Sequence, residues 1–399
     1  MRDTVYMIDK PLLAAVVTLL TFSLMMSYSL STYTVIHFHY TDFHFFIRQS
    51  IAVFIALITM TIISKMDPDK WLVPISMTLF VTFFLLMIAM QFLPSSLVKE
   101  VGGAKRWIHM GPISIAPVEF FKIGFVFFLS WSLVRKFKSK GKMSFMEEIR
   151  AFSPYVVLFM FIVVLIAIFQ KDLGQVVVLG GTLVILFLLV GSSYKFFLTL
   201  VAGAFGAFVA LIFAAPHRVA RIKSWWSTVQ DNILALLPFE GVQNLRVDAA
   251  KEPYQISNSL NAIHNGGYLG QGLGNGQFKL GYLSEVHTDF ILAGVSEEFG
   301  FLGLAFVTFT ILFIIYRIFK IASKVSEPIY YLFCVGMGLL IAFAFVLNAY
   351  GISGITPIKG IAVPFLSYGG SHILAAGLAI GMVLMISKKV PRDAQGRML

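Results

Sequence analysis

The chain has little cysteine, and its histidines are not spaced as metal-binding pairs. Cys334 is the single cysteine in 399 residues, so no disulfide can form within the chain. Because Cys334 lies inside an apolar run, we expect it to be a small buried side chain. The eight histidines show none of the spacings that bind zinc, so the sequence identifies no metal ligands.

Charge is also scarce. Charged residues make up 13% of the chain and hydrophobic residues 58%, with a mean hydropathy of +0.84, which excludes an ordinary soluble domain. A membrane-spanning helix needs about 20 mostly apolar residues. Ten segments qualify: 11–29, 45–64, 71–93, 115–134, 152–170, 174–190, 194–215, 289–316, 328–350 and 362–387. We therefore expect an all-α polytopic membrane protein with about ten transmembrane helices.

The net charge of +11 is distributed unevenly between the loops. With a cytoplasmic N-terminus, 18 of the 31 Lys and Arg residues fall on the cytoplasmic side, whereas the short outer loops hold only Lys171 and Lys359. This asymmetry follows the positive-inside rule and predicts that both termini are cytoplasmic. The basic loop 135–150 is then an orientation signal beside anionic lipids, and the charge gives no reason to expect a nucleic-acid partner.

The chain shows no internal repeat, low-complexity tract or proline-rich linker, so we treat residues 1–399 as one integral membrane domain. Its longest polar segment, 216–288, is predicted to be an extracytoplasmic loop between the seventh and eighth helices, and 388–399 a cytoplasmic tail. Loops as long as 216–288 are usually functional or disordered. Because this loop contains several aromatic residues and an apolar stretch, we expect it to pack on the membrane surface and to contribute to a site.

Two pairs of candidate residues lie around the fourth predicted helix. Glu119 and Lys122 are three residues apart and therefore share one helix face. Ionisable side chains at membrane depth are usually functional, although such a pair could also merely satisfy itself. Before this helix, Arg106 and Trp107 end a glycine-containing basic stretch that suits a phosphate or a sugar at the membrane surface. The alternative for Trp107 is a simple interfacial anchor.

Two further candidates lie in predicted outer segments. Asp172 belongs to the tight polar turn Gln170–Gly174 between two spans, which could also be a plain turn with a charge pair. Gln255 precedes a series of glycines that permits close backbone approach. These glycines are not a nucleotide fingerprint, because a phosphate-binding loop needs a strand before it and a helix after it.

The end of the long loop carries the catalytic candidate. Asp289 is predicted at the membrane surface, where partial desolvation raises the pKa of a carboxyl toward the range of a general base. On a regular helix Glu298 lies on the opposite face from Asp289, so we expect Glu298 to be structural and to have a hydrogen-bond or ionic partner. Lys359 and Ser367 belong to a broken entry into the last span, which must be buried in protein or face water.

These motifs, in this order, resemble the SEDS family of peptidoglycan glycosyltransferases over nearly the full length of the chain. The motifs that carry the resemblance are Gly103–Trp107, Pro117–Glu119 with Lys122, Gln170–Gly174, Tyr254–Gln255 with Ser259, Leu283–Asp289, Glu297–Gly300 and Pro364–Ser371. The chain departs from the family pattern where Ala116 replaces Gln, Val118 Ser, Lys171 Pro, Ser284 Pro and His372 Ser. Lys359 is more similar to the cell-division branch of the family than to the elongation branch, which more often has Thr.

The resemblance implies that the chain polymerises lipid II into β-1,4 glycan strands at the outer face of the bacterial cytoplasmic (inner) membrane, for septal wall synthesis. Asp289 would accept the proton of the attacking sugar hydroxyl as undecaprenyl diphosphate leaves. Arg106, Lys122, Arg218 and Arg221 would offset the charge of the diphosphate, together with a divalent cation, Mg²⁺ or Mn²⁺. The implied partners are the nascent glycan strand, membrane lipids, a class B penicillin-binding transpeptidase and other proteins of the division machinery.

Other functions stay open at this point. A ten-span protein with Glu119 and Lys122 inside the membrane could transport lipid II as a flippase. The chain could also be an elongation polymerase, or a scaffold that binds a partner synthase. Because a buried cation seeks a carboxylate, we further expect Lys122 to lie near Asp289 across the outer cavity.

Overall fold

The computed structural model describes residues 7–100, 104–111, 113–137, 143–234, 246–247, 254–357 and 360–391. Within these residues nine helices are long and apolar enough to cross a membrane, and α7, Leu173–Leu189, is a shorter apolar helix. The nine are α1 Lys10–Leu30, α3 His44–Lys65, α4 Pro68–Ala89, α5 Pro117–Phe137, α6 Phe145–Val163 with its π-helical continuation Val164–Phe169, α8 Tyr194–Phe213, α11 Ile291–Lys324, α12 Pro328–Ile352 and α13 Gly370–Ser387. The chain is a polytopic all-helical membrane protein, as predicted.

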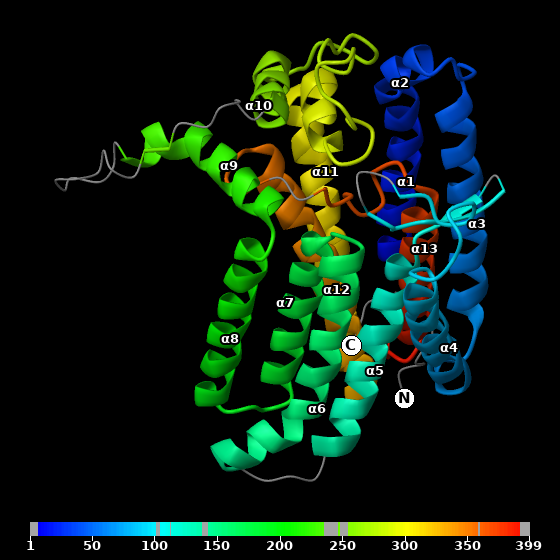
Figure 1. The fold of residues 1–399 in the computed structure, drawn as a ribbon. Helices are drawn as coiled ribbons and strands as arrows, with labels where there is room; N and C mark the ends of the chain where they lie inside the picture. Colours follow the sequence, from blue (N-terminus) through cyan, green and yellow to red (C-terminus); the bar gives the residue numbers. More distant parts are fainter. Residues whose placement is uncertain are drawn as a thin grey trace.

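The remaining elements lie toward one end of the helical bundle (Figure 1). They are α2 Thr32–His37, α9 Pro216–Leu234, α10 Tyr254–Gly266 and an antiparallel hairpin of β1 Ile108–Met110 and β2 Ile113–Ile115. Since α9 and α10 belong to the long polar segment 216–288, the described part of that segment includes regular structure. Its apolar stretch after α9 lies outside the described residues.

Each of the ten predicted spans corresponds to a helix, but several of the predicted starts differ. The helix of the fifth span, α6, begins at Phe145 and so before the predicted residue 152. The last span begins at Gly370, because Pro364 and the left-handed Phe365 (φ 64°) interrupt helical geometry before it. The eighth span begins after Asp289, which therefore lies in the turn before α11. This placement removes the carboxylate of Asp289 from the membrane-spanning segment.

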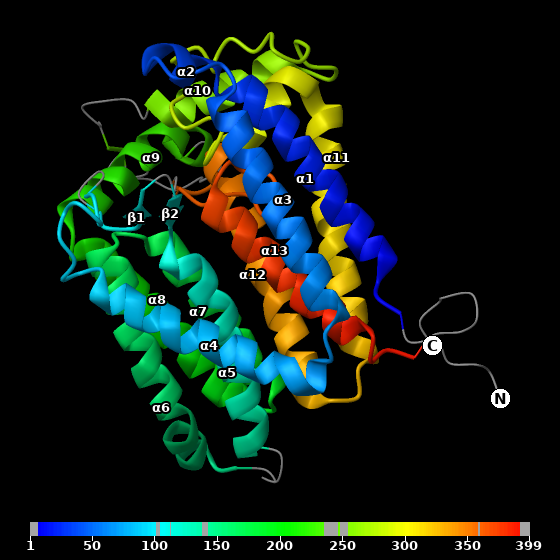
Figure 2. The same cartoon turned by 90° about the vertical axis from the view of Figure 1, so that its right-hand side faces the viewer.

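The helices form two groups, with α12 between them (Figure 2). One group contains α1, α3, α11 and α13, the other α4 to α8, and α12 packs against α11, α5 and α7. Glycine permits the closest contacts: a β-carbon on Gly377 of α13 would lie 2.8 Å from that of Ala56 in α3, and one on Gly124 of α5 would lie 2.3 Å from the backbone nitrogen of Phe80 in α4. Small residues of this kind let membrane helices associate through van der Waals packing.

The two ends of the described chain meet at the end of the bundle opposite to α9 and α10 (Figure 1). The backbone N–H of Asp9, before α1, donates to the hydroxyl of Ser387 at 3.0 Å. The carboxylate of Asp9 also forms a 2.5 Å ion pair with Arg317 of α11. Because ten segments cross the bundle, the chain returns to the end from which it started.

Candidate active site

The backbone of Asp289 is fixed by a buried amide. The carbonyl oxygen of Asp289 accepts a hydrogen bond of 2.7 Å from Nδ2 of Asn348, which also donates to the carbonyl of Ile361 at 2.6 Å. Asn348 is a buried residue of α12, so its amide ties Asp289 to the segment that precedes α13. The side chain of Asp289 itself is only partly buried.

The two residues before Asp289 are held by the same segment. The hydroxyl of Ser367 donates to the carbonyl of Thr288 at 2.6 Å, and the backbone N–H of Tyr368 donates to the carbonyl of His287 at 2.9 Å. Ser367 is completely buried, so the structure gives it a positioning role. Its direct contact with a substrate stays a prediction.

The surroundings of Asp289 raise its pKa to about 6. The main cause is burial, which removes water from the carboxylate, and the negative charges of Glu285 and Asp172 add to it. Arg106 and His372 act in the opposite direction. A carboxyl group whose pKa lies close to neutrality is suited to accept and release a proton in catalysis.

Glu119 and Lys122 form the centre of a polar cluster inside the bundle. Nζ of Lys122 lies 3.1 Å from Oε2 of Glu119 and 3.0 Å from Oε1 of Gln175, while Gln175 donates to Oε1 of Glu119 at 3.0 Å. Nδ1 of His372 lies 3.1 Å from the same Glu119 oxygen as Lys122. Among the described residues Lys122 forms its ion pair with Glu119 and none directly with Asp289, and the expected closeness of Lys122 to Asp289 across the cavity stays a prediction.

The predicted turn Gln170–Asp172 is closed by Arg106. Nε of Arg106 donates to the carbonyl of Gln170 at 2.9 Å, and Nη2 donates to that of Lys171 at 3.0 Å. Asp172 is buried and caps α7 by accepting the backbone N–H of Gln175 at 3.2 Å. Burial raises the pKa of Asp172, and Arg106 opposes this shift. The contact of Asp172 with a substrate stays a prediction.

A basic pocket of about 250 Å³ lies beside this turn. Three of the predicted diphosphate ligands, Arg106, Arg218 and Arg221, meet in it from segments far apart in the sequence. The pocket is lined by Arg106, Lys171, Leu173, Gly174, Phe208, Ile212, His217, Arg218, Arg221, Ile222, Trp225, Leu347, Thr356 and Pro357. Among the described residues, the buried hydroxyl oxygen of Thr356 has no hydrogen-bond partner.

None of the described residues that line this pocket is acidic, although Asp172 and Asp289 interact electrostatically with Arg106 from outside the lining. Arg218 is held by backbone carbonyls, with Nη1 2.6 Å from Leu211 O and Nη2 2.5 Å from Ala167 O. Burial, followed by the charge of Arg221, lowers the pKa of Arg218. The pKa of His217 is lowered by burial and then by the neighbouring cations. Mutually repelling cations around an apolar pocket favour an anion.

Two of the other predicted substrate-binding residues, Trp107 and Gln255, do not line the pocket. Trp107 is half-buried directly after Arg106. Gln255 is exposed at the start of α10 and donates from Nε2 to the hydroxyl of Ser284 at 2.9 Å. Lys359 lies outside the residues that the structure describes. The roles of these residues in substrate binding stay predictions.

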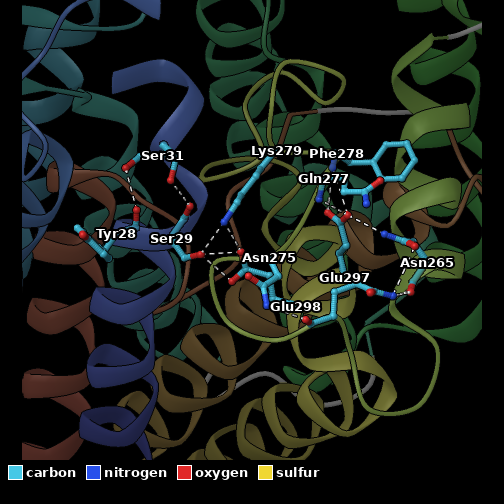
Figure 3. Close-up of polar contacts among 12 residues, drawn as sticks. Tyr28, Ser29, Ser31, Asn265, Asn275, Gln277, Phe278, Lys279, Glu297 and Glu298 are labelled. Carbon is cyan, nitrogen blue, oxygen red and sulfur yellow. Dashed lines mark hydrogen bonds and ion pairs between the residues drawn. The ribbon is translucent and has the colours of Figure 1, made fainter. Parts of the chain in front are cut away.

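Glu298 has the ionic partner that its position predicts (Figure 3). Nζ of Lys279 lies 2.7 Å from Oε1 of Glu298 and 3.0 Å from the hydroxyl of Ser29, and the hydroxyl lies 2.6 and 2.7 Å from the two carboxylate oxygens. The adjacent Glu297 accepts from two consecutive backbone N–H groups just before Lys279, at 2.6 and 3.2 Å. These two carboxylates therefore fasten the loop that leads to Asp289 onto α11 and α1.

The same loop fills a break in α11. Gly300 has φ 65° and ψ −160°, so helical hydrogen bonding is interrupted there. Two N–H groups of the loop after α10 donate to the carbonyls of Glu297 and Glu298, each at 2.9 Å, and two of its carbonyls accept from the N–H groups after the break at 2.9 and 3.3 Å. The backbone groups that the break exposes are thus satisfied by the loop.

The predicted divalent cation has no evident protein site. Among the described residues, no group of three or more His, Cys, Asp or Glu side chains is placed to hold a metal ion. Glu285 and Asp172 are near enough to influence Asp289 electrostatically, but they do not join it in such a group. The donor set of the described residues therefore does not fit a dedicated metal centre.

The prediction from sequence missed several residues of the site. Gln175, Asn348 and His372 are polar side chains inside predicted apolar spans, a signal that marks functional positions in membrane proteins. Lys171 was noted only as an outer-loop cation and as a departure from the family pattern, and Thr356 was not singled out. Their convergence depends on tertiary structure.

The chain matches known proteins over most of its length. Residues 10–391 match the family model of the cell cycle proteins FtsW, RodA and SpoVE. A Helicobacter pylori protein named probable peptidoglycan glycosyltransferase FtsW is 48% identical over 383 residues, which cover 95% of this chain and 98% of that protein. A protein of the same name from Aliivibrio salmonicida is 31% identical over 349 residues, covering 86% and 80% of the two chains.

Two solved structures are similar in fold. The rod shape determining protein RodA of Thermus thermophilus has a TM-score of 0.64 at 20% identity, over 95% of this chain and 96% of that one. A chain from a structure titled "Structural coordination of polymerization and crosslinking by a peptidoglycan synthase complex" has a TM-score of 0.69 at 21% identity, over 95% and 97%. At these identities the similarity shows the fold alone.

Proposed function

The chain belongs to the FtsW, RodA and SpoVE family of cell cycle proteins, and from this premise we propose that it is a peptidoglycan glycosyltransferase that polymerises lipid II. The relative that is 48% identical carries the name of such an enzyme and is matched over 98% of its length. The main observation behind the mechanism is the position of Asp289. Its carboxylate interacts electrostatically with Arg106, which also lines the basic pocket.

Asp289 is the general base. The reaction joins the hydroxyl of one lipid-linked sugar to the anomeric carbon of another, so a proton must leave the hydroxyl as the bond forms. A half-buried carboxylate with a pKa of about 6 is largely ionised at neutral pH and can take that proton. Hydrogen bonds to the carbonyls of residues 287, 288 and 289 keep this carboxylate in place.

The basic pocket binds the diphosphate that leaves. Arg106, Arg218 and Arg221 supply positive charge where negative charge develops on the leaving group. The apolar lining, which includes Phe208 and Ile212 of α8, suits the first isoprene units of the lipid. Lys122 is committed to Glu119 and Gln175, so its contribution to diphosphate binding is indirect.

A divalent cation would be held mainly by the diphosphate of the substrate. The described carboxylates do not form a cluster that could bind a metal without the substrate. We therefore derive no catalytic step from a metal ion, and we assign the described cations to charge neutralisation.

The site faces away from the cytoplasm. This orientation is supported by the excess of Lys and Arg on the loops at the opposite end and by the meeting of both described chain ends there. It places both termini in the cytoplasm and the enzyme in the cytoplasmic membrane. A reporter enzyme that is active only outside the cytoplasm should be active when it is fused near Gln243. Activity of a reporter that works only in the cytoplasm, fused at the same position, would contradict the orientation.

The protein acts in septal wall synthesis together with a class B penicillin-binding transpeptidase. Support comes from the FtsW name of the relatives and from the fold shared with a chain of a peptidoglycan synthase complex. The nascent glycan strand and other division proteins are its further partners. Depletion of the protein should block division before elongation, whereas loss of rod shape without a division defect would favour an elongation polymerase.

The decisive experiment is the substitution Asp289→Asn. It keeps the size of the side chain and removes the base, so lipid II polymerisation should fall by about 10²–10⁴-fold while lipid II binding persists. Asp231→Asn is a matched control, because Asp231 is an exposed residue of α9 whose partner is Arg246. Near wild-type polymerisation by Asp289→Asn would contradict the catalytic assignment and would favour a lipid II transporter that uses the Glu119 cluster.

A further inference from the structure

Lys171 has an unusual backbone conformation beside the basic pocket. Its φ angle is 50°, in the left-handed region that residues with a β-carbon rarely adopt. Such conformations cost energy and concentrate at functional sites, where the surrounding structure enforces them. Here the enforcing contact is visible, because Nη2 of Arg106 donates to the carbonyl of Lys171 at 3.0 Å.

Proline cannot adopt the turn that this chain uses. The proline ring fixes φ near −65°, which is incompatible with the 50° of Lys171. The departure from the family pattern at this position is therefore a change in backbone geometry as well as in side chain. It places an ammonium group at a pocket where proline would offer none.

The ammonium group belongs to the electrostatic environment of the pocket. Lys171 is one of the lining residues, together with Arg106, Arg218 and Arg221. Its charge contributes to lowering the pKa of His217, although burial and the two arginines contribute more. None of the described residues forms an ion pair with Lys171.

We propose that Lys171 binds the diphosphate of the lipid-linked donor and is a fourth cation of the basic pocket. This inference rests on the proposed function of the site. The left-handed turn presents the lysine, and Arg106 serves twice, by holding the turn through the carbonyl of Lys171 and by contributing its own charge. Lys171 contacts the leaving group and takes no proton, so it contributes to substrate binding and to neutralising the charge that develops on the diphosphate.

The test is Lys171→Gly in the full-length protein reconstituted in lipid vesicles. Glycine adopts φ 50° without strain, so the turn is kept while the lysine side chain and its ammonium group are lost. A hydrogen bond to a charged group contributes enough that KM for lipid II should rise about tenfold. The value of kcat should fall as well, because the negative charge on the leaving diphosphate grows toward the transition state and Lys171 no longer offsets it.

A matched control removes a cation from the same region without touching the pocket. Lys223 is exposed on α9 and is not among the lining residues, so Lys223→Gln should leave KM unchanged. Inhibition by undecaprenyl diphosphate provides a second measurement. Lys171→Gly should lose sensitivity to this product by the same factor as it loses affinity for lipid II, and Lys223→Gln should not.

Three outcomes separate this inference from the proposed function. An unchanged KM in Lys171→Gly together with an unchanged affinity for undecaprenyl diphosphate shows that Lys171 only shapes the turn and overturns the inference. If the wild-type protein forms no glycan, the proposed function fails. Direct binding of undecaprenyl diphosphate to the wild type and to Lys171→Gly then decides the role of Lys171, since equal affinities would contradict it.

Discussion

Gly360 lies directly against the carboxylate of Asp289. A β-carbon added to Gly360 would be 2.9 Å from Oδ2 of Asp289, closer than two such atoms normally approach. The φ angle of Gly360 is 60°, which also favours glycine. The backbone at this position therefore forms one wall of the catalytic site and leaves no room for a side chain.

Gly360→Ala should reduce polymerisation without unfolding the protein. The methyl group must push the Asp289 carboxylate aside by a few tenths of an ångström, and misplacement of a catalytic group lowers the rate of an enzyme. Gly354→Ala is the matched control, because Gly354 also has a positive φ of 72° but an added β-carbon would be 3.4 Å from Ile256, in ordinary contact. Equal activity of the two variants in a lipid II polymerisation assay would contradict the proposed wall.

The sequence predicts the spanning helices well because the bilayer imposes their length and polarity. All ten apolar segments are helices, and Glu298 has the buried ionic partner expected of a carboxylate on its face of α11. The break at Gly300 could not be predicted in the same way. Its exposed backbone groups are satisfied by a loop some thirty residues earlier in the chain, and no local pattern specifies such pairing.

The sequence predicted several residues of the site, but it did not predict which of them contact one another. Arg106, Arg218 and Arg221 were all expected to meet the diphosphate, and the fold does bring them into one pocket. Lys122 was expected to lie near Asp289, but its ion pair is with Glu119, and Gln175 completes these interactions. Whether two distant charged residues form an ion pair depends on the hydrogen-bond partners that each already has nearby. Those partners are determined by the tertiary structure and cannot be identified from the sequence.

The rate of polymerisation should fall as the pH drops through about 6. Asp289 acts only when ionised, and its surroundings raise its pKa to about 6, so protonation below this pH removes the base. Glu285 is one of the charges that raise this pKa, besides burial and Asp172, while Arg106 and His372 lower it. Glu285→Gln should therefore move the acidic limb of the kcat/KM profile to lower pH.

The measurement is the initial rate of lipid II polymerisation across the pH range for the wild type and Glu285→Gln. Asp231→Asn, which removes a carboxylate remote from the site, should leave the profile where it is. A limb that moves to higher pH in Glu285→Gln would contradict the assignment of Asp289 as the group that titrates.

Lys279→Met should destabilise the protein substantially. The substitution leaves the carboxylate of Glu298 buried without its cation, and loss of one partner from a buried ion pair costs about 3–5 kcal/mol. The double variant Lys279→Met with Glu298→Gln removes both charges and should recover much of this loss. Thermal unfolding of the purified variants in detergent checks the order, and a double variant less stable than Lys279→Met would contradict the pairing.

His217 should make diphosphate binding stronger as the pH falls. In the free pocket its pKa lies below the ordinary value, first because of burial and then because Arg218, Arg221 and Lys171 repel a further proton. A bound diphosphate offsets these cations and raises the pKa of His217, so binding takes up a proton in the interval between the two values. The affinity for undecaprenyl diphosphate should therefore increase on going from about pH 8 toward pH 6 and level off below the pKa of His217 in the free pocket.

The control for this prediction is His217→Gln, because the ligand itself gains protons in this pH range, which weakens binding. In this variant the diphosphate of the ligand still titrates, but the side chain at position 217 does not. As the pH falls, the affinity of the variant for undecaprenyl diphosphate should therefore decrease relative to that of the wild type. Parallel pH profiles for the two proteins would show that His217 stays neutral beside the ligand and that the arginines alone neutralise it.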